Sequence, residues 1–407
     1  MSEVITAEGT LTLTPGDCRI AHGLSFAPRA LVLWWSRQSQ DGVAPTNSGG
    51  LGFAVAGSEA GSIGWIAEDG VARSRTASYA HAGAIVGLVD SNAPLPALTG
   101  RVDFLPSGFA LRVLTITAEW RVHFLAVGGA SVRACAGWLR SPDVRGRQRI
   151  AVGLRPDLLL FASISGDGSQ SRRRGLSISI GAASSPARQG SVALRSPDAA
   201  PPGTVAGAQR TDAAILAIGD RLQTVAAARV ASIDADGFSL AWSEDDALQV
   251  LYLAIAGVGC RVGAAASPTR PGRLRVRRLG LPPQAIMCFS WGLRASLTVT
   301  RIGRLSIGAA SGPAEGGAVS WDVGNKDTAV TASHVQSRPG SLLLVPDTQT
   351  GGMHASAALV RFERRGFTLD WPQSDGQRRE FLYVAIGRAT SRRVTSTAQR
   401  FLGRIRH

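Results

Sequence analysis

A stretch that recurs at a domain-sized spacing constrains this chain more than any other feature of the sequence. Its clearest copy is Asp236-Gly237-Phe238-Ser239-Leu240-Ala241-Trp242, followed by Tyr252-Leu253-Ala254-Ile255-Ala256-Gly257. Gly366-Phe367-Thr368-Leu369-Asp370-Trp371 leads in the same way into Tyr383-Val384-Ala385-Ile386-Gly387, and a weaker copy, Gly108-Phe109-Ala110-Leu111, leads into Phe124-Leu125-Ala126-Val127-Gly128. The leading glycines lie 129 residues apart both times (237 − 108 and 366 − 237). Because this spacing is the length of a domain, it predicts three copies of one fold and not a solenoid of short repeats.

Two further marks recur at nearly the same spacing. A proline precedes an apolar run at Pro28, Pro156 and Pro283, and an apolar strand ends in aspartate at Asp90, Asp220 and Asp347. A chain of 407 residues divides into two or three domains of about 150 residues, and the repeat selects three. We therefore predict tandem homologous domains at residues 1–138, 139–265 and 266–407, each long enough to bury its own core.

The apolar patterning predicts an all-β fold. Strand-length apolar runs separated by turn residues fill each domain, and no amphipathic helical stretch exceeds two turns, so we expect seven or eight short strands packed as an antiparallel β-sandwich. Asp236-Gly237 predicts a tight hairpin turn with glycine at positive φ. The apolar runs at 30–35, 158–161 and 285–289 do not alternate, which predicts strands buried on both faces, between the sheet partner and a covering loop or a neighbouring domain.

Composition leaves the nature of any partner open. The net charge is +15, and Lys326 is the only lysine, so the charge comes almost entirely from arginine. Codon bias in a GC-rich genome accounts for such a skew, and so does an anionic partner such as an acidic protein, a glycan or lipopolysaccharide, or nucleic acid. The cysteines, at positions 18, 135, 260 and 288, do not keep the repeat register, which favours buried reduced thiols over disulfides.

The residues suited to catalysis or metal binding are scattered. The six histidines show no metal-ligand spacing, no glycine pattern of a phosphate loop precedes Lys326, and the Gly-x-Ser-x-Gly elbow is missing. Glu244, Asp245 and Asp246 form an acidic cluster that we place in a solvated turn between two hairpin strands, with weak calcium binding as the alternative. The sequence thus predicts neither an enzyme nor a cofactor site. The irregular loops at 40–50, 165–175 and 195–211 are where binding residues are expected.

Arginines alternate along two predicted strands. Arg145, Arg147 and Arg149 form one set, and Arg273, Arg275 and Arg277 form the other. A period of two places each set on one face of its strand, either as charge that protects an edge strand from aggregation or as a basic stripe that docks an acidic partner. The aromatic residues Trp242, Trp371, Tyr252 and Tyr383 have core-facing neighbours, so a stacking surface for single-stranded nucleic acid is not expected.

The segment at residues 388–407 is a second candidate contact. It contains Arg388, Arg392, Arg393, Arg400, Arg404 and Arg406 with no acidic residue. We also group it with strand-like segments at 10–13, at the start of the chain, and at 131–136, at the junction between the first two domains. An unpaired strand segment of this kind either contacts another chain or frays as a basic terminus.

The start of the chain predicts synthesis and folding in the cytoplasm. Met1 is followed by acidic residues at Glu3 and Glu8, whereas a secretory signal peptide needs a basic start and an apolar core. No apolar run approaches the ~20 residues of a membrane-spanning helix, so we expect no membrane span.

The repeated motif resembles a known group of proteins. An apolar strand after a Gly…Pro mark, then Gly-Phe-Ser/Thr-Leu-x-Trp, then Tyr-Leu/Val-Ala-Ile resembles β-sandwich modules in virion proteins of tailed bacteriophages and related particles, and is distantly similar to H-type lectin domains. The resemblance rests on Gly237, Phe238, Trp242 and Tyr252, on their counterparts Gly366, Phe367, Trp371 and Tyr383, and on Gly108 and Phe109. The sugar-contacting positions of the lectins have no residue match in these loops.

The resemblance implies a binding and assembly module without catalysis. It implies a virion location, in the tail or as head decoration, with other virion proteins and copies of itself as partners and a cell-surface glycan as a further candidate. The alternative is a carbohydrate-binding protein that uses its three sandwiches as a pseudo-trimeric lectin. Direct nucleic-acid binding is not expected.

Overall fold

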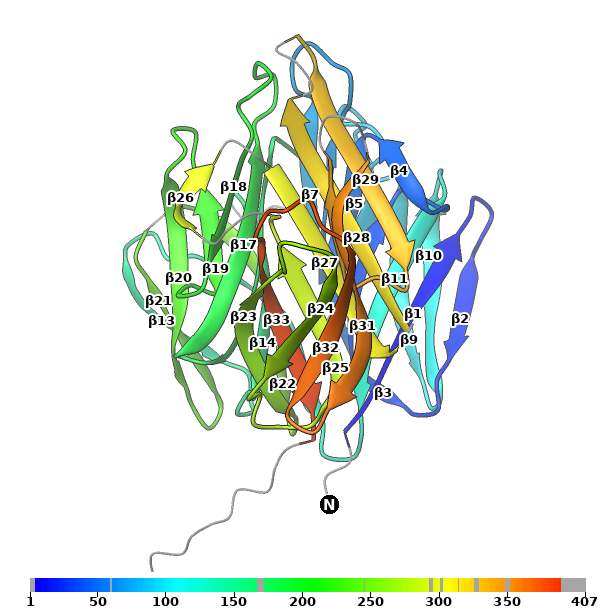
Figure 1. The fold of residues 1–407 in the computed structure, drawn as a ribbon, viewed down its shortest axis with the longest axis vertical. Coiled ribbons are helices and arrows are strands. Elements are labelled where there is room, and N and C mark those ends of the chain that lie inside the picture. Colours follow the sequence, from blue (N-terminus) through cyan, green and yellow to red (C-terminus); the bar gives the residue numbers. More distant parts are fainter. Residues whose placement is uncertain are drawn as a thin grey trace, which may run out of the picture.

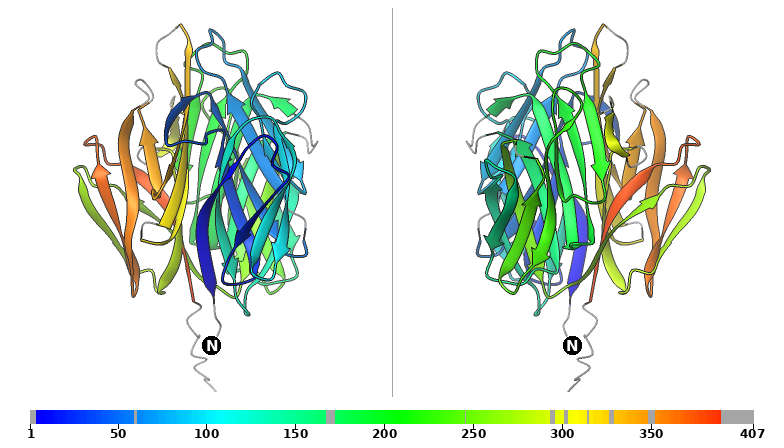
Figure 2. Two further views of the ribbon diagram at one scale, coloured as in Figure 1. Left: turned by 90° about the vertical axis from the view of Figure 1, so that its right-hand side faces the viewer. Right: turned by 90° about the vertical axis from the view of Figure 1, so that its left-hand side faces the viewer.

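The alternating apolar runs form β-strands throughout the described chain, which contains no helix in this computed structural model (Figure 1). The structure describes residues 4–388 apart from 59–60, 167–171, 245, 293–295, 301–302, 314, 326–328 and 348–351. The strands form six antiparallel sheets that pack as sandwich-like bodies (Figure 2). The predicted all-β class is therefore confirmed. No helix capable of crossing a membrane occurs in the described residues.

The sheets alternate between seven and four strands, which lie in the following spatial order. The first pair holds β1 (Ile5–Leu13), β11 (Trp120–Gly128), β3 (Pro28–Ser36), β5 (Asn47–Val55), β6 (Gly61–Ala67), β7 (Thr76–Ala82) and β15 (Arg172–Arg174), with β2 (Arg19–Gly23), β10 (Gly108–Ile116), β9 (Leu98–Leu105) and β8 (Ile85–Gly87) in the small sheet. The second pair holds β12 (Arg133–Arg140), β22 (Leu248–Ala256), β14 (Leu158–Ser165), β16 (Leu176–Ser185), β17 (Arg188–Ser196), β18 (Ala206–Arg210) and β26 (Ser296–Thr300), with β13 (Gly146–Ala151), β21 (Gly237–Trp242), β20 (Thr224–Ile233) and β19 (Ile215–Ile218). The third pair holds β23 (Gly259–Ala266), β33 (Glu380–Gly387), β25 (Pro283–Ser290), β27 (Gly303–Gly312), β28 (Glu315–Asn325), β29 (Thr331–Pro339) and β4 (Gly42–Pro45), with β24 (Gly272–Arg277), β32 (Gly366–Gln373), β31 (Met353–Glu363) and β30 (Leu343–Pro346).

The three sheet pairs share one strand order. We call strands β1–β11 unit 1, strands β12–β22 unit 2 and strands β23–β33 unit 3. Adding 11 to each strand number of unit 1 reproduces the order of unit 2, and adding 22 reproduces the order of unit 3. The motif positions agree, because Trp242 pairs with Gly146 on β13 and Trp371 pairs with Gly272 on β24.

One short strand of each unit leaves its own sheet. β4 pairs with β29 of unit 3, β15 pairs with β7 of unit 1, and β26 pairs with β18 of unit 2. Each unit therefore gives a strand to one neighbour and receives a strand from the other. This exchange closes a ring of three units and covers the outermost strand of each unit's own large sheet, which would otherwise be a free edge.

Two kinds of hydrophobic core hold the molecule together. Each unit has its own core between the large and small sheets, and a further core gathers residues from the large sheets of all three units. Strand β3 contributes to both, because Trp34 lies in the shared core while Leu33 and Trp35 lie in the core of unit 1. The prediction that the non-alternating strands are buried on both faces is confirmed, and the second face packs against the neighbouring units.

Aromatic residues join the units directly in the shared core. The ring centroids of Trp65 in unit 1 and Trp321 in unit 3 lie 4.9 Å apart in an edge-to-face arrangement, and both side chains are fully buried. The indole nitrogen of Trp321 donates to the carbonyl oxygen of Ser48, 3.3 Å away. Contacts between domains that are this buried are typical of the interior of a single domain and not of a transient contact between domains.

The predicted hairpin turn at Asp236-Gly237 is present, but the two strands of the repeated motif lie in different sheets and do not pair with each other as predicted. The turn before Gly237 joins β20 to β21, two paired strands of the small sheet. The next strand, β22, carries Tyr252 and belongs to the large sheet. The chain crosses the sandwich between them because Phe238 and Tyr252 are both core residues, and their rings meet edge-to-face with centroids 5.7 Å apart.

The leading glycine of the motif is required by a close approach of two strands. Positive φ was predicted for Gly237, but only Gly108 among the three leading glycines has it, at 144°. A Cβ atom on Gly237 would lie 2.0 Å from the carbonyl oxygen of Ile150, and one on Gly366 would lie 2.2 Å from that of Val276. Only glycine allows the neighbouring backbone to come this near.

Three other expectations need correction. The described part of each unit holds eleven strands, not seven or eight, because the loops contain further short strands. The predicted boundaries at 138/139 and 265/266 fall inside β12 and β23, which pair with β22 and β33 and so belong with the unit that follows. Cys18 is exposed, although Cys288 is buried and all four cysteines are free as expected.

The molecule has two distinct ends. Strand β1 begins opposite Gly128, and β33 ends at Gly387, both at the lower end in Figure 1. We call this the terminal end. The large sheets run from there to the opposite, distal end, where β4 lies.

Candidate ligand-binding pocket

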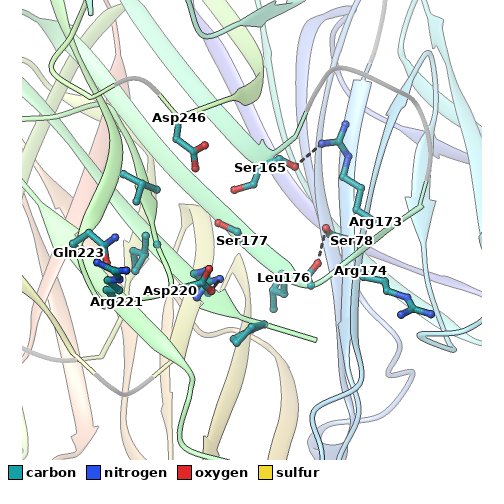
Figure 3. Close-up of a pocket in the computed structure, with 16 residues that line it drawn as sticks. Ser78, Ser165, Arg173, Arg174, Leu176, Ser177, Asp220, Arg221, Gln223 and Asp246 are labelled. Atoms are coloured by element: carbon teal, nitrogen blue, oxygen red, sulfur yellow. Dashed lines mark hydrogen bonds and ion pairs between the residues drawn. The ribbon is translucent and has the colours of Figure 1, made fainter. Parts of the chain in front are cut away.

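A pocket opens at the distal end of unit 2, beside the strand exchanged with unit 1. Its volume is about 390 Å³ (Figure 3). Charged and polar side chains make up most of its lining: Arg173, Arg174, Arg195, Arg221, Asp220, Asp246, Gln223, Ser78, Ser165 and Ser177. Four arginines against two aspartates give a charge of +2 (4 − 2), and the lining contains no aromatic residue.

Arg173 is held in place by the backbone around it. It lies on β15, the strand that unit 2 gives to the sheet of unit 1. Its Nη1 donates to the carbonyl oxygen of Ser165, 2.6 Å away (Figure 3). Gly166 has a φ of 133°, and a Cβ atom there would lie 0.8 Å from the same Nη1. The guanidinium of Arg173 therefore occupies space that only a glycine at position 166 leaves open.

Unit 1 contributes one residue, Ser78, to the lining of the pocket. The hydroxyl of Ser78 on β7 donates to the carbonyl oxygen of Gly175, 2.9 Å away, just after β15. This bond fastens the exchanged strand at the point where the chain returns to unit 2. Ser78 therefore reaches the pocket through the strand exchange between units 1 and 2.

Arg195 lines this pocket and forms an ion pair in which it is the more buried partner. It lies on β17, opposite Ser177 on β16. Its guanidinium pairs with the carboxylate of Asp220, and the side chain of Arg195 is 15% exposed while that of Asp220 is 82% exposed. The buried member of this ion pair is thus the cation, and its anion reaches in from solvent.

The equivalent place in unit 3 is filled by a buried ion pair. Arg304 stands at the position of Ser177, and Asp322 stands at the position of Arg195. Arg304 Nε lies 3.5 Å from Asp322 Oδ1, with side-chain exposures of 7% and 0%. Burial raises the pKa of Asp322 to about 7, although the neighbouring Arg304 lowers it. Burial in turn lowers the pKa of Arg304.

In unit 1 the two corresponding positions hold uncharged side chains. Ser48 and Ile66 occupy the two positions, and the hydroxyl of Ser48 donates to the carbonyl oxygen of Leu88. A separate pocket of about 340 Å³ opens nearby and is acidic, lined by Thr46, Glu68, Asp69, Arg75, Val89, Asp90 and Asn92. Among the described residues no group of three or more His, Cys, Asp and Glu side chains is placed to hold a metal ion.

The predicted arginine stripes lie on edge strands of the small sheets. Arg147 and Arg149 are exposed on β13, as are Arg273, Arg275 and Arg277 on β24, while the residues between them are partly or fully buried. Several stripe arginines form ion pairs within the chain: Arg145 with Glu244 at 3.2 Å, Arg149 with Asp236 at 2.6 Å, and Arg275 with Glu363 at 2.5 Å. The alternation is present as predicted, and none of these arginines lines the pocket of unit 2.

The motif residues lie in the sandwich cores. All of them are buried: Gly108, Phe109, Gly237, Phe238, Trp242, Tyr252, Gly366, Phe367, Trp371 and Tyr383. Among the predicted contact residues, Arg392, Arg393, Arg404 and Arg406 lie outside the described residues, as does Asp245 of the acidic cluster. Glu244 and Asp246 lie in the crossing from the small to the large sheet, not within a hairpin.

Sequence reasoning located the pocket only in outline. The irregular loops at 165–175 and 195–211 supply Arg173, Arg174 and Arg195, and the recurring aspartate supplies Asp220. The run of three arginines at 172–174 was an available signal, but it is continuous and does not alternate as the predicted stripes do. Ser78 could not have been found, because it reaches the site through a strand exchange between units.

Comparison with known proteins adds little to this geometry. No family model and no curated protein matches the chain. One solved structure with a weak similarity is the VP2 subviral particle of infectious bursal disease virus, with 9% identity over 95% of this chain and 80% of the other. Its TM-score of 0.09 is too low to carry an argument about fold or function.

Proposed function

We propose that this chain is a structural and assembly protein of a tailed phage or phage-like particle, associated with the tail or with head decoration, and not an enzyme. In this proposal the three units are homologous domains in tandem, which together act as a trimer made from one chain. The observation that carries it is the closed ring of exchanged strands around a shared core. Such a body is fixed in shape, as a building block of a particle must be.

The two ends of the molecule suggest how it sits in a particle. The described chain begins and ends at the terminal end, so this end is available to join other virion proteins together with residues 388–407. The distal end carries the pocket of unit 2 and faces away from that junction. This polarity suits a protein that is anchored at one end and contributes to host-surface attachment at the other.

The composition of purified particles tests this proposal. Particles from cells that carry this gene are expected to contain the chain in a fixed ratio to the major head or tail protein, measured by quantitative mass spectrometry. A chain that ends at residue 387 tests the terminal contact. Its incorporation is expected to fall, and to fall more at low than at moderate salt, because salt already screens the attraction of the basic segment in the full-length chain. Absence of the full-length chain from intact particles would contradict the proposal.

A carbohydrate-binding role is the second candidate, and the pocket of unit 2 favours it. The pocket has a volume within the range of about 300–1,000 Å³ that is usual for ligand sites, and its lining is rich in hydrogen-bond donors. It also lies at the end opposite the chain termini. Binding of the purified chain to a panel of bacterial surface glycans tests this role, and uniform lack of binding would contradict it.

A further inference from the structure

The comparison of the three units identifies what is missing from the pocket of unit 2. In unit 3, the cation Arg304 and the anion Asp322 stand on facing strands and form a buried ion pair. In unit 2 the corresponding positions hold Ser177 and Arg195. Arg195 is therefore a largely buried cation that lacks an equivalent anion across the strand pair, and a small serine leaves the space open.

The carboxylate of Asp220, which pairs with Arg195, can be displaced by the anionic group of a ligand. Asp220 is 82% exposed, and an ion pair with an exposed member is screened by solvent and contributes little to stability. A ligand anion can compete for Arg195 at small cost, because Asp220 is readily hydrated when it is released. A planar guanidinium also offers paired donors that match a carboxylate, phosphate or sulfate group.

The remaining lining supplies further donors for the same kind of ligand. Arg173 is fixed by Ser165 and Gly166, and exposed Arg221 lines the wall that carries Asp220. The serine hydroxyl groups of the lining and the amide of Gln223 can each donate or accept a hydrogen bond. They therefore suit a ligand that carries several hydroxyl groups. The lining thus combines net positive charge with neutral polar groups.

We propose that the pocket of unit 2 binds an acidic sugar, with Arg195 as the main contact to its anionic group and Arg173 and Arg221 as supporting cations. The shared chemistry is a carboxylate, phosphate or sulfate on a hydroxylated ring. This inference rests on the second candidate function and names the ligand class of that site.

The test measures binding of the full-length chain by isothermal titration calorimetry. The probes are glucuronate, glucose 6-phosphate and glucose 6-sulfate, with neutral glucose and inorganic phosphate as comparisons. At least one charged sugar is expected to bind more tightly than both comparisons, and the three arms show which anion is preferred. If glucose binds as tightly as the charged sugars, the anionic group plays no role and the proposal is wrong. If inorganic phosphate binds as tightly as the charged sugars, the pocket is a general anion site and the assignment of a sugar is wrong.

Two variants and one control assign the binding to this pocket. Arg195→Gln removes the main cation, and Ser177→Asp places an internal anion opposite Arg195. Each is expected to weaken binding about tenfold or more, as for the loss of a charged hydrogen bond. Arg147→Gln removes an exposed arginine of the same unit outside the pocket and is expected to leave binding unchanged. An equal loss of affinity in all three variants would show that only the net charge of the chain matters. It would contradict the assignment of the binding to this pocket.

The two proposals can fail separately. If the chain binds a neutral glycan of the panel but no acidic sugar, only the ligand inference fails. If it binds no glycan and no acidic sugar, the carbohydrate-binding role fails as well, and the particle proposal is unaffected. If it binds an acidic sugar but is missing from particles, only the particle proposal fails.

Discussion

At the residue scale, one acidic side chain is buried at the contact between units 1 and 3. The backbone nitrogen of Glu8 on β1 donates to the hydroxyl of Ser311 in unit 3, and its Oε1 is buried. A Cβ atom on Gly317 would lie 2.9 Å from this oxygen, so unit 3 packs directly on it. Burial, reinforced by Glu315, raises the pKa of Glu8 to about 8.

This shift predicts that stability depends on Glu8 above acidic pH. Because the pKa in the folded state is raised from 4.5 to about 8, the contribution of protonated Glu8 is complete below pH 4.5 and is lost as the pH rises toward 8. Glu8→Gln should therefore reduce the loss of stability between pH 5 and pH 9, measured as urea midpoints. Exposed Glu119→Gln serves as the control and should follow the wild type. Identical pH profiles for all three proteins would rule out a buried acid at this contact.

A second residue-scale prediction concerns the core phenylalanine of the motif. Phe238 is fully buried and its ring meets those of Phe161 and Tyr252. Phe238→Ala is expected to cost about 3–5 kcal/mol of unfolding free energy, as for other core aromatics. Leu114→Ala, at a site that is 53% exposed, should change the urea midpoint little. A Phe238→Ala midpoint within error of the wild type would place the ring outside the core.

At the element scale, close approach between strands of the small sheet explains why glycine leads each motif copy. Gly237→Ala is expected to lower the urea midpoint strongly, because the new Cβ would meet the carbonyl oxygen of Ile150 at 2.0 Å. Gly23→Ala is the matched control, since a Cβ there meets nothing within 4 Å. If both variants unfold at the same urea concentration, the close approach does not limit the choice of residue.

The elements also show what the sequence could and could not predict. The alternation around Phe238 and the apolar run of β3 indicate strands, burial and repetition, because period and burial are properties of single strands. Sheet membership is different. Nothing in the alternation reveals that β22 lies across the sandwich from β21, or that β15 pairs with unit 1, because short exchanged strands follow from the packing of whole units.

At the scale of the whole molecule, the three units are parts of one body. Their large sheets share one core, Trp65 packs on Trp321 between units, and each unit completes a neighbour's sheet. The repeat predicted three similar folds. It did not predict the shared core or the exchanged strands, because the predicted boundaries treated each fold as self-sufficient.

Hydrogen–deuterium exchange of the intact chain across a urea series tests this central claim most directly. The strands to compare are β3, β14 and β25, one from each unit, which are equivalent in position and buried on both faces. If the shared core makes the three units one cooperative body, their amides should open with the same free energy and the same dependence on urea. Exchange of one of these strands at low urea, while the other two stay protected, would show that the units are independent and would contradict the account.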